Sequence, residues 1–126
     1  MKKQILIIED EQVLLELLSD KFKDSGFIVS EATSAEDGIK KALQNLPDLI
    51  LLDILLPKMN GLTMLKKLRQ DPWGETVPVI ILSNLSDQKK VSEAIEIGVY
   101  DFLVKSEVKL ADIVKQVSEV LQPEDH

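Results

Sequence analysis

The sequence has no cysteine, and it has only five glycines and five prolines in 126 residues. Disulfides, thiolate metal sites and cysteine nucleophiles are therefore excluded, and so is a fibrous or low-complexity chain. Long apolar runs are also missing. The run near the N-terminus covers residues 5–8 before Glu9, which is too short for a signal-peptide core or a membrane span. We expect a cytoplasmic protein without membrane association.

Basic residues are in the minority, with 15 lysines and arginines against 22 acidic residues and a net charge of −7. A protein that binds a phosphate backbone normally shows the opposite balance, so direct nucleic-acid binding by this domain is not expected. The length and the 44% of hydrophobic residues favour one globular domain over residues 1–126. Residues 122–126 are interpreted as a tail or as the start of a linker.

Two kinds of segment alternate along the chain. Short runs rich in isoleucine, leucine and valine predict strands at residues 4–8, 27–31, 49–52, 79–82 and 102–104. The stretches between and after them place apolar residues three or four apart, which predicts five amphipathic helices. Their apolar faces are expected to consist of Val13, Leu14, Leu17, Leu18 and Phe22; Ile39, Ala42, Leu43 and Leu46; Leu62, Leu65 and Leu68; Val91, Ala94 and Ile95; and Leu110, Ile113, Val114, Val117, Val120 and Leu121.

The expected helix ends carry matching signals. Ser34 begins a pattern similar to a capping box, and Ser86-Asp87 can cap the fourth helix. Gly26 and Gly98 are placed where helices should end. Because strand–helix–strand crossovers are short and right-handed, this (βα)5 alternation predicts a parallel sheet with helices on both faces. In such sheets the ligand site lies beyond the carboxyl ends of the strands.

Polar residues follow four of the predicted strands. Three acids, Glu9-Asp10-Glu11, come after the first strand, and Asp53 comes after the third. Ser83 follows the fourth strand and Lys105 the fifth. The predicted topology brings these positions, which are far apart in sequence, to one edge of the sheet.

The residue types at this edge indicate phosphoryl chemistry with a divalent cation. Glu9, Asp10 and Asp53 would repel one another in one crevice, and a hard cation offsets that repulsion. Mg²⁺ fits because it takes one or two carboxylates, waters and phosphate oxygens. A free carboxylate oxygen of Asp53 can attack phosphorus to form an acyl phosphate, while Ser83 and Lys105 contact the phosphoryl oxygens.

Four motifs resemble the response regulator receiver family of two-component signalling. They are IEDE at residues 8–11, DILLPKMNG at residues 53–61, ILS ending at Ser83, and the lysine of LVK at Lys105. The resemblance covers the whole chain. It implies a doubly wound α/β three-layer sandwich of the flavodoxin-like, CheY-like type, with parallel strands in the order 2-1-3-4-5.

The resemblance also implies a role for each acidic residue of the site. Asp53 is expected to be the phosphorylation site. Asp10, Asp53 and the backbone carbonyl of Leu55 are expected to bind Mg²⁺ directly, whereas Glu9 is expected to act through water.

Four further residues are expected to contact or sense the phosphoryl group. The resemblance implies that Ser83, Lys105 and the backbone N–H of Asn84 bind it. Ser83 and Phe102 are expected to form the switch pair. Phe102 has a second interpretation, as a partly buried strand residue, and both stay open.

The same resemblance implies the partners. The phosphoryl donor is expected to be a sensor histidine kinase or a phosphotransfer protein. Residues 86–121 are expected to carry the signal to a downstream effector protein or a fused output domain, and homodimer formation on activation is compatible with this scheme. No enzymatic turnover is expected beyond self-catalysed phosphorylation and dephosphorylation.

The sequence departs from the family pattern in three ways. Lys105 is followed by Ser106 where proline is usual, so a trans peptide bond is expected because a non-proline cis bond costs roughly 3–4 kcal/mol. Asn84 is larger than usual and is expected to narrow access for the phosphodonor. Leu55 and Leu85 lie two residues beyond Asp53 and Ser83, and they suggest a long-lived phosphoryl state.

Three rival functions were weighed on the same residues. A flavin-phosphate site would need a loop rich in serine, threonine and glycine after the first strand, where acids stand instead. A haloacid-type phosphatase would need a second aspartate two residues after its nucleophile, where Leu55 stands. The third rival is a degenerate receiver that docks proteins without being phosphorylated, and it stays open.

Overall fold

A computed structural model describes residues 2–84 and 88–121, in which five strands alternate with five helices. The strands are nearly where the sequence predicts them, since β2 is shifted by one residue and β4 and β5 are each one residue longer. The elements are β1 Gln4–Ile8, α1 Gln12–Asp24, β2 Ile28–Ala32, α2 Ala35–Asn45, β3 Leu49–Leu52, α3 Gly61–Arg69, β4 Val79–Ser83, α4 Gln88–Ile97, β5 Asp101–Val104 and α5 Leu110–Leu121.

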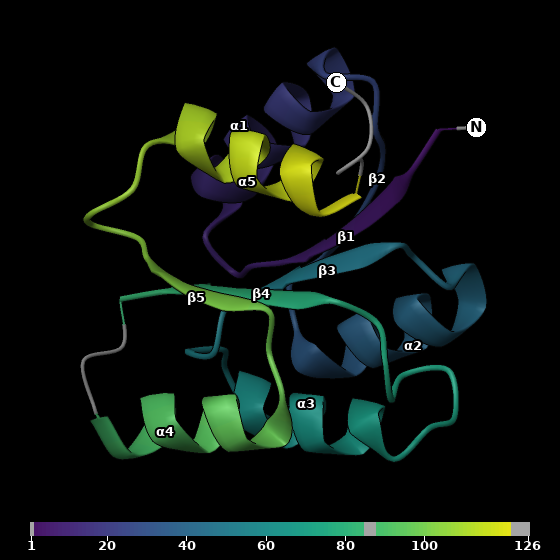
Figure 1. Ribbon diagram of the computed structural model, residues 1–126, viewed down its shortest axis with the longest axis vertical. Helices are drawn as coiled ribbons and strands as arrows, with labels where there is room; N and C mark the ends of the chain where they lie inside the picture. Colours follow the sequence, from purple (N-terminus) through teal and green to yellow (C-terminus); the bar gives the residue numbers. More distant parts are fainter. Residues whose placement is uncertain (1, 85–87, 122–126) are drawn as a thin grey trace.

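The five strands form one parallel sheet in the order β2-β1-β3-β4-β5. Helices α1 and α5 cover one face, and α2, α3 and α4 cover the other (Figure 1). This arrangement confirms the predicted doubly wound α/β sandwich. The strand order reverses at β1 and β3, so the carboxyl ends of these two strands flank the crevice in which such folds bind ligands.

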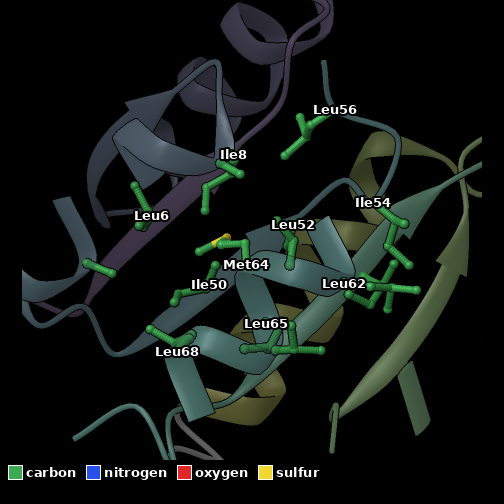
Figure 2. Close-up of a cluster of buried hydrophobic side chains, with 14 of the residues drawn as sticks. Leu6, Ile8, Ile50, Leu52, Ile54, Leu56, Leu62, Met64, Leu65 and Leu68 are labelled. Carbon is green, nitrogen blue, oxygen red and sulfur yellow. The ribbon is translucent and has the colours of Figure 1, made fainter. Parts of the chain in front are cut away.

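Each central strand contributes to two separate hydrophobic cores because its side chains alternate between the faces. Ile5 and Ile7 of β1 pack toward α1 and α5, whereas Leu6 and Ile8 pack toward α2 and α3. Figure 2 shows the second cluster, in which residues of β1 and β3 lie opposite side chains of α3. Burial on both faces explains why β1, β3 and β4 are nearly uninterrupted apolar runs.

Most of the expected helix-end signals are confirmed. The Ser34 hydroxyl caps α2 by accepting from the backbone N–H of Asp37 at 3.2 Å. Gly26 and Gly98 follow α1 and α4 with φ of +93° and +109°, a conformation that favours glycine. The expected Ser86-Asp87 cap lies outside the described residues.

The predicted apolar faces of α1, α2 and α4 are partly wrong. Val13 and Leu17 of α1 are 72% and 47% exposed, and Leu43, Leu46 and Ile95 are also exposed. In α2 the buried positions are held by small residues, Ala35, Gly38 and Ala42. A Cβ atom on Gly38 would lie 2.6 Å from Cδ1 of Ile8, so α2 packs closely on β1 and a larger residue would require the Ile8 side chain to move.

The Arg69 guanidinium, at the end of α3, joins three segments at the amino edge of the sheet. It donates to the carbonyls of Gly74 and Val77, each at 2.7 Å, and through two nitrogens to the carbonyl of Gly98. Gly98 directly follows α4. One side chain therefore ties the ends of α3 and α4 to the segment that enters β4.

Gly61 is the first residue of α3 and follows the N-cap residue Asn60. The loop residue with positive φ is Lys58, at +64°. Gly61 lies against the segment that follows β3, where an added Cβ would be 2.6 Å from the carbonyl oxygen of Asp53. Absence of a side chain at Gly61 therefore allows α3 to begin beside Asp53.

Replacing Gly61 by alanine is expected to lower the free energy of unfolding by about 1–3 kcal/mol, because the Asp53 segment must shift to admit the methyl group. Urea denaturation measures this loss. Thr63→Ala is the matched control, since Thr63 is an exposed residue of the same helix. A loss for Gly61→Ala no larger than for the control would contradict the tight packing at this position.

Candidate functional site

The carboxyl edge of the sheet collects the polar residues that the sequence places after the strands. Glu9 and Asp10 follow β1, and Asp53 follows β3. Ser83 is the last residue of β4, and Lys105 comes directly after β5. Glu9, Asp53 and Ser83 are buried, and burial of the two carboxylates is uncommon unless they are paired.

Backbone hydrogen bonds fix Asp53 at the centre of this edge. Its N–H donates to the carbonyl of Ile8 at 3.0 Å, which continues the pairing of β3 with β1 beyond the last strand residue. Its Oδ1 accepts from the N–H of Leu55 at 3.0 Å. The carboxylate is therefore oriented by the chain on either side of it.

Lys105 contacts three carboxylates. Its Nζ lies 2.7 Å from Oε1 of Glu9, 2.9 Å from Oε1 of Glu11 and 2.9 Å from Oδ2 of Asp53. An ammonium group has three donor hydrogens, so each carboxylate can receive one. The contact between Lys105 and Glu11 was not predicted, because an acid at the start of α1 is readily explained by the attraction of acids to helix N-termini.

The charges in this cluster shift two pKa values in the same direction for different reasons. Burial alone would lower the pKa of Lys105, but its hydrogen bonds to Glu9, Glu11 and Asp53 outweigh burial and raise the pKa above its usual range. For Glu9, by contrast, burial raises the pKa. The hydrogen bond from Lys105 opposes this rise, and the neighbouring charge of Asp53 adds to it. Lys105 therefore stays charged at neutral pH, whereas the ionised form of Glu9 is disfavoured.

Replacing Glu9 by glutamine is expected to stabilise the metal-free protein at pH 7. A carboxyl with a raised pKa contributes stability that is present below its ordinary pKa of 4.5 and is lost as pH rises through the folded-state value. Glutamine imitates the protonated form at every pH. The difference between the two proteins should shrink as pH falls toward 4.5.

Urea denaturation in EDTA from pH 4 to pH 8 checks this expectation, with Glu16→Gln as the exposed control. The explanation would be wrong if Glu9→Gln were less stable than wild type at pH 7.

The three acids form a set suited to a metal ion. One carboxylate oxygen from each of Glu9, Asp10 and Asp53 lies within 4.8 Å of the other two. Opposite ligands of a Mg²⁺ ion at about 2.1 Å are ~4.2 Å apart, so these oxygens are close enough to surround one ion, either directly or through a water bound to it. The donor set is all oxygen, which is what Mg²⁺ prefers. The residues present therefore fit this ion.

Ser83 carries the only buried side-chain N or O atom without a hydrogen-bond partner among residues 2–84 and 88–121. Its residue is fully buried at the end of β4, and its backbone carbonyl accepts from the N–H of Lys105 at 3.1 Å. A buried hydroxyl without a partner is costly in a folded protein and calls for a ligand or a water. Ser83 and Lys105, predicted to act on one group, are thus neighbours.

Asn84 and Ser106 are in direct contact. The Ser106 N–H donates to Oδ1 of Asn84 at 2.9 Å. Among the described residues no peptide bond is cis, so the Lys105–Ser106 bond is trans, as expected. Asn84 and Ser106, two separate departures from the family pattern in the sequence, are therefore partners in the structure.

Phe102 lies on the groove between α4 and β5. It is partly buried and packs against the cluster that lies beneath α3 and α4. The groove has a volume of about 450 Å3, and its lining includes Val91 and Val104. This position is compatible with both interpretations of Phe102. Leu55 is exposed, and Leu85 lies outside the described residues.

The fold and this site together define the class of CheY-like domains, namely doubly wound five-stranded α/β proteins with an acidic crevice at the carboxyl edge. The family model of the response regulator receiver domain matches residues 5–118. The chain belongs to the response regulator receiver domain family and therefore to two-component signalling.

Individual proteins support this assignment. The chain is 37% identical to response regulator ArlR of Staphylococcus aureus over 102 residues, which cover 81% of this chain and 45% of ArlR. It is similar to the crystal structure of a CheY-like receiver domain protein from Methanospirillum hungatei, with a TM-score of 0.90, 24% identity and 98% and 96% coverage of the two chains. The phosphorylated cyanobacterial phytochrome response regulator RcpA gives a TM-score of 0.85 at 25% identity, with 100% and 98% coverage.

The chain spans less than half the length of the curated relatives it matches. What those longer proteins do as a whole is therefore not carried over to it. No helix in the described ranges is both long and apolar enough to cross a membrane.

Proposed function

We propose that this protein is a phosphorylation-activated switch whose phosphoryl acceptor is Asp53. The observation that carries the proposal is the buried Asp53 carboxylate, which lies 2.9 Å from the Lys105 ammonium in a set of acids suited to a metal. The donor would be a phosphohistidine on a sensor histidine kinase or a phosphotransfer protein. The similar protein RcpA has a crystal structure in its phosphorylated form, which supports phosphorylation of a protein with this fold.

The transfer needs little beyond positioning. A carboxylate oxygen of Asp53 forms a bond to phosphorus while the phosphorus–nitrogen bond of the donor breaks and the imidazole leaves. Lys105 supplies a fixed positive charge for the transferred group. The unpartnered hydroxyl of Ser83 and the backbone N–H of Asn84 can donate to its oxygens.

Glu9, Asp10, Asp53 and the backbone carbonyl of Leu55 are proposed to hold Mg²⁺, with Glu9 acting through water. The ion, when bound, would neutralise the carboxylates and accept a phosphoryl oxygen. The 4.8 Å limit on the oxygen separations of Glu9, Asp10 and Asp53 supports this set.

The signal is proposed to leave through the face made by α4, β5 and α5. Ser83 lies at the end of β4 and Phe102 in the groove beside α4, so a movement of the Ser83 hydroxyl toward phosphate would be transmitted through this groove. The partner that responds to the signal is a downstream effector protein, a fused output domain or a second copy of the chain. The proposed location of this exchange is the cytoplasm.

Intact-mass analysis after incubation with phosphoramidate or acetyl phosphate tests the proposal. We expect one phosphoryl adduct that requires Mg²⁺, disappears in EDTA and is released by hydroxylamine, as an acyl phosphate is. Absence of an adduct, under conditions that label a known receiver domain, would favour the phosphorylation-independent docking module. Slow loss of the adduct after donor removal would support the long-lived state, whereas a half-life of seconds would contradict it.

A further inference from the structure

Two loops carry the residues that are proposed to contact the phosphoryl group. The chain leaves β4 after Ser83 and leaves β5 before Lys105, and both exits are on the same side of the sheet (Figure 1). One backbone hydrogen bond joins the exits, from the Lys105 N–H to the Ser83 carbonyl at 3.1 Å. After β5 ends at Val104 the chain forms a turn at residues 105–107.

A side chain supplies the next connection. The Ser106 N–H donates to Oδ1 of Asn84 at 2.9 Å, so two consecutive N–H groups after β5 are bonded to the last residue of β4 and to the residue that follows it. Proline at position 106 has no N–H to give, and alanine at position 84 has no oxygen to accept it. The contact therefore needs the side-chain oxygen of Asn84 and a residue other than proline at position 106.

The same contact determines where the Asn84 side chain lies. Its carbonyl is committed to the segment after Lys105, and Lys105 itself points to Glu9, Glu11 and Asp53. Asn84 is expected from its size to narrow the path of the phosphodonor. The hydrogen bond shows that its side chain also connects the two loops.

We propose that Asn84 is a positioning residue for phosphoryl transfer, which acts by clamping the segment that carries Lys105 to the segment that carries Ser83 through the Ser106 N–H. This inference rests on the proposed function. The clamp fixes the Lys105 ammonium and the Ser83 hydroxyl relative to one another before the phosphoryl group arrives. Groups held in place before reaction contribute more to the rate than groups that must first be ordered.

The test compares the phosphorylation rates of variants with phosphoramidate at saturating Mg²⁺. Asn84→Ala and Ser106→Pro are each expected to slow the reaction about fivefold, the rate equivalent of one hydrogen bond. Ser106→Ala is the matched control, because it removes only the hydroxyl and keeps the N–H, and it should react at the wild-type rate. In the double variant Asn84→Ala/Ser106→Pro the loss should stay about fivefold, because both changes break one contact.

Three results would overturn the clamp. Faster reaction of Asn84→Ala would show that the side chain only obstructs the donor. Multiplication of the two losses in the double variant would show that they act independently. A rate loss that appears only near the melting temperature, and not well below it, would show a structural role alone, so the rates are measured at both temperatures. The affinity for Mg²⁺ is measured in parallel, and the clamp should not alter it.

The wild-type reaction separates this inference from the proposal on which it depends. If wild type is not labelled, the proposed function fails and the clamp fails with it. If wild type is labelled and the Asn84 and Ser106 variants match its rate, only the clamp is wrong.

Discussion

Replacing Asp53 by asparagine is expected to remove the phosphoryl adduct completely. Asparagine keeps an oxygen that can accept from the N–H of Leu55, so the local chain should remain as it is in the wild type. An amide oxygen, however, is a poor nucleophile and a poor metal ligand compared with a carboxylate, and no acyl phosphate can form on it. Intact-mass analysis with phosphoramidate and Mg²⁺ checks the result.

The matched control for this change is Asp20→Asn, which removes a carboxylate from the exposed side of α1. This variant should be labelled like wild type. An adduct that persists in Asp53→Asn with the same hydroxylamine sensitivity would place the acceptor on another carboxylate and would overturn the assignment.

Replacing Lys105 by methionine is expected to have the largest effect on stability. In EDTA the free energy of unfolding should fall by about 3–5 kcal/mol, because the buried carboxylates of Glu9 and Asp53 lose the cation that they share. Added Mg²⁺ should return part of this loss, since an ion bound by the acids opposes the same repulsion. Phosphorylation should slow by about 100-fold, a typical effect of removing one fixed charge from a transfer site.

Urea denaturation measures the loss of stability, and intact-mass kinetics measure the loss of rate. Lys115→Met is the control, because Lys115 is an exposed residue of α5. Because the pKa of Lys105 is raised, its contribution to stability is present below the ordinary value of 10.5 and is constant around neutral pH. Equal or higher stability of Lys105→Met in EDTA would show that the carboxylates do not depend on this lysine.

Much of the fold could be predicted because burial on both faces makes the central strands continuous apolar runs. The starts of β1, β3 and β4 were predicted to the residue for this reason. The helix faces were harder to predict. Periodicity alone does not reveal that α2 packs through Gly38 on Ile8, so the larger residues Leu43 and Leu46 were wrongly placed inside.

The site shows a similar division. Glu9, Asp53 and Ser83 could be found because each ends a predicted strand, and the fold then brings them together. Contacts that depend on the path of a loop could not be found. Neither the reach of Lys105 to Glu11 nor the bond between Ser106 and Asn84 leaves a pattern in residue spacing.

The guanidinium of Arg69 holds the end of α4 in place and leaves its start free of this restraint. The carbonyl of Gly98, one residue past the end of the helix, is held by two nitrogens of this side chain, whereas Gln88 at the start of α4 lines the same groove as Asn84. Any displacement that begins at Ser83 should therefore swing the first turn of α4 through the widest arc and leave its last turn almost in place. A partner that binds the first turn of α4 would meet the largest change in its binding surface. A partner that binds the last turn would meet almost none and would remain bound.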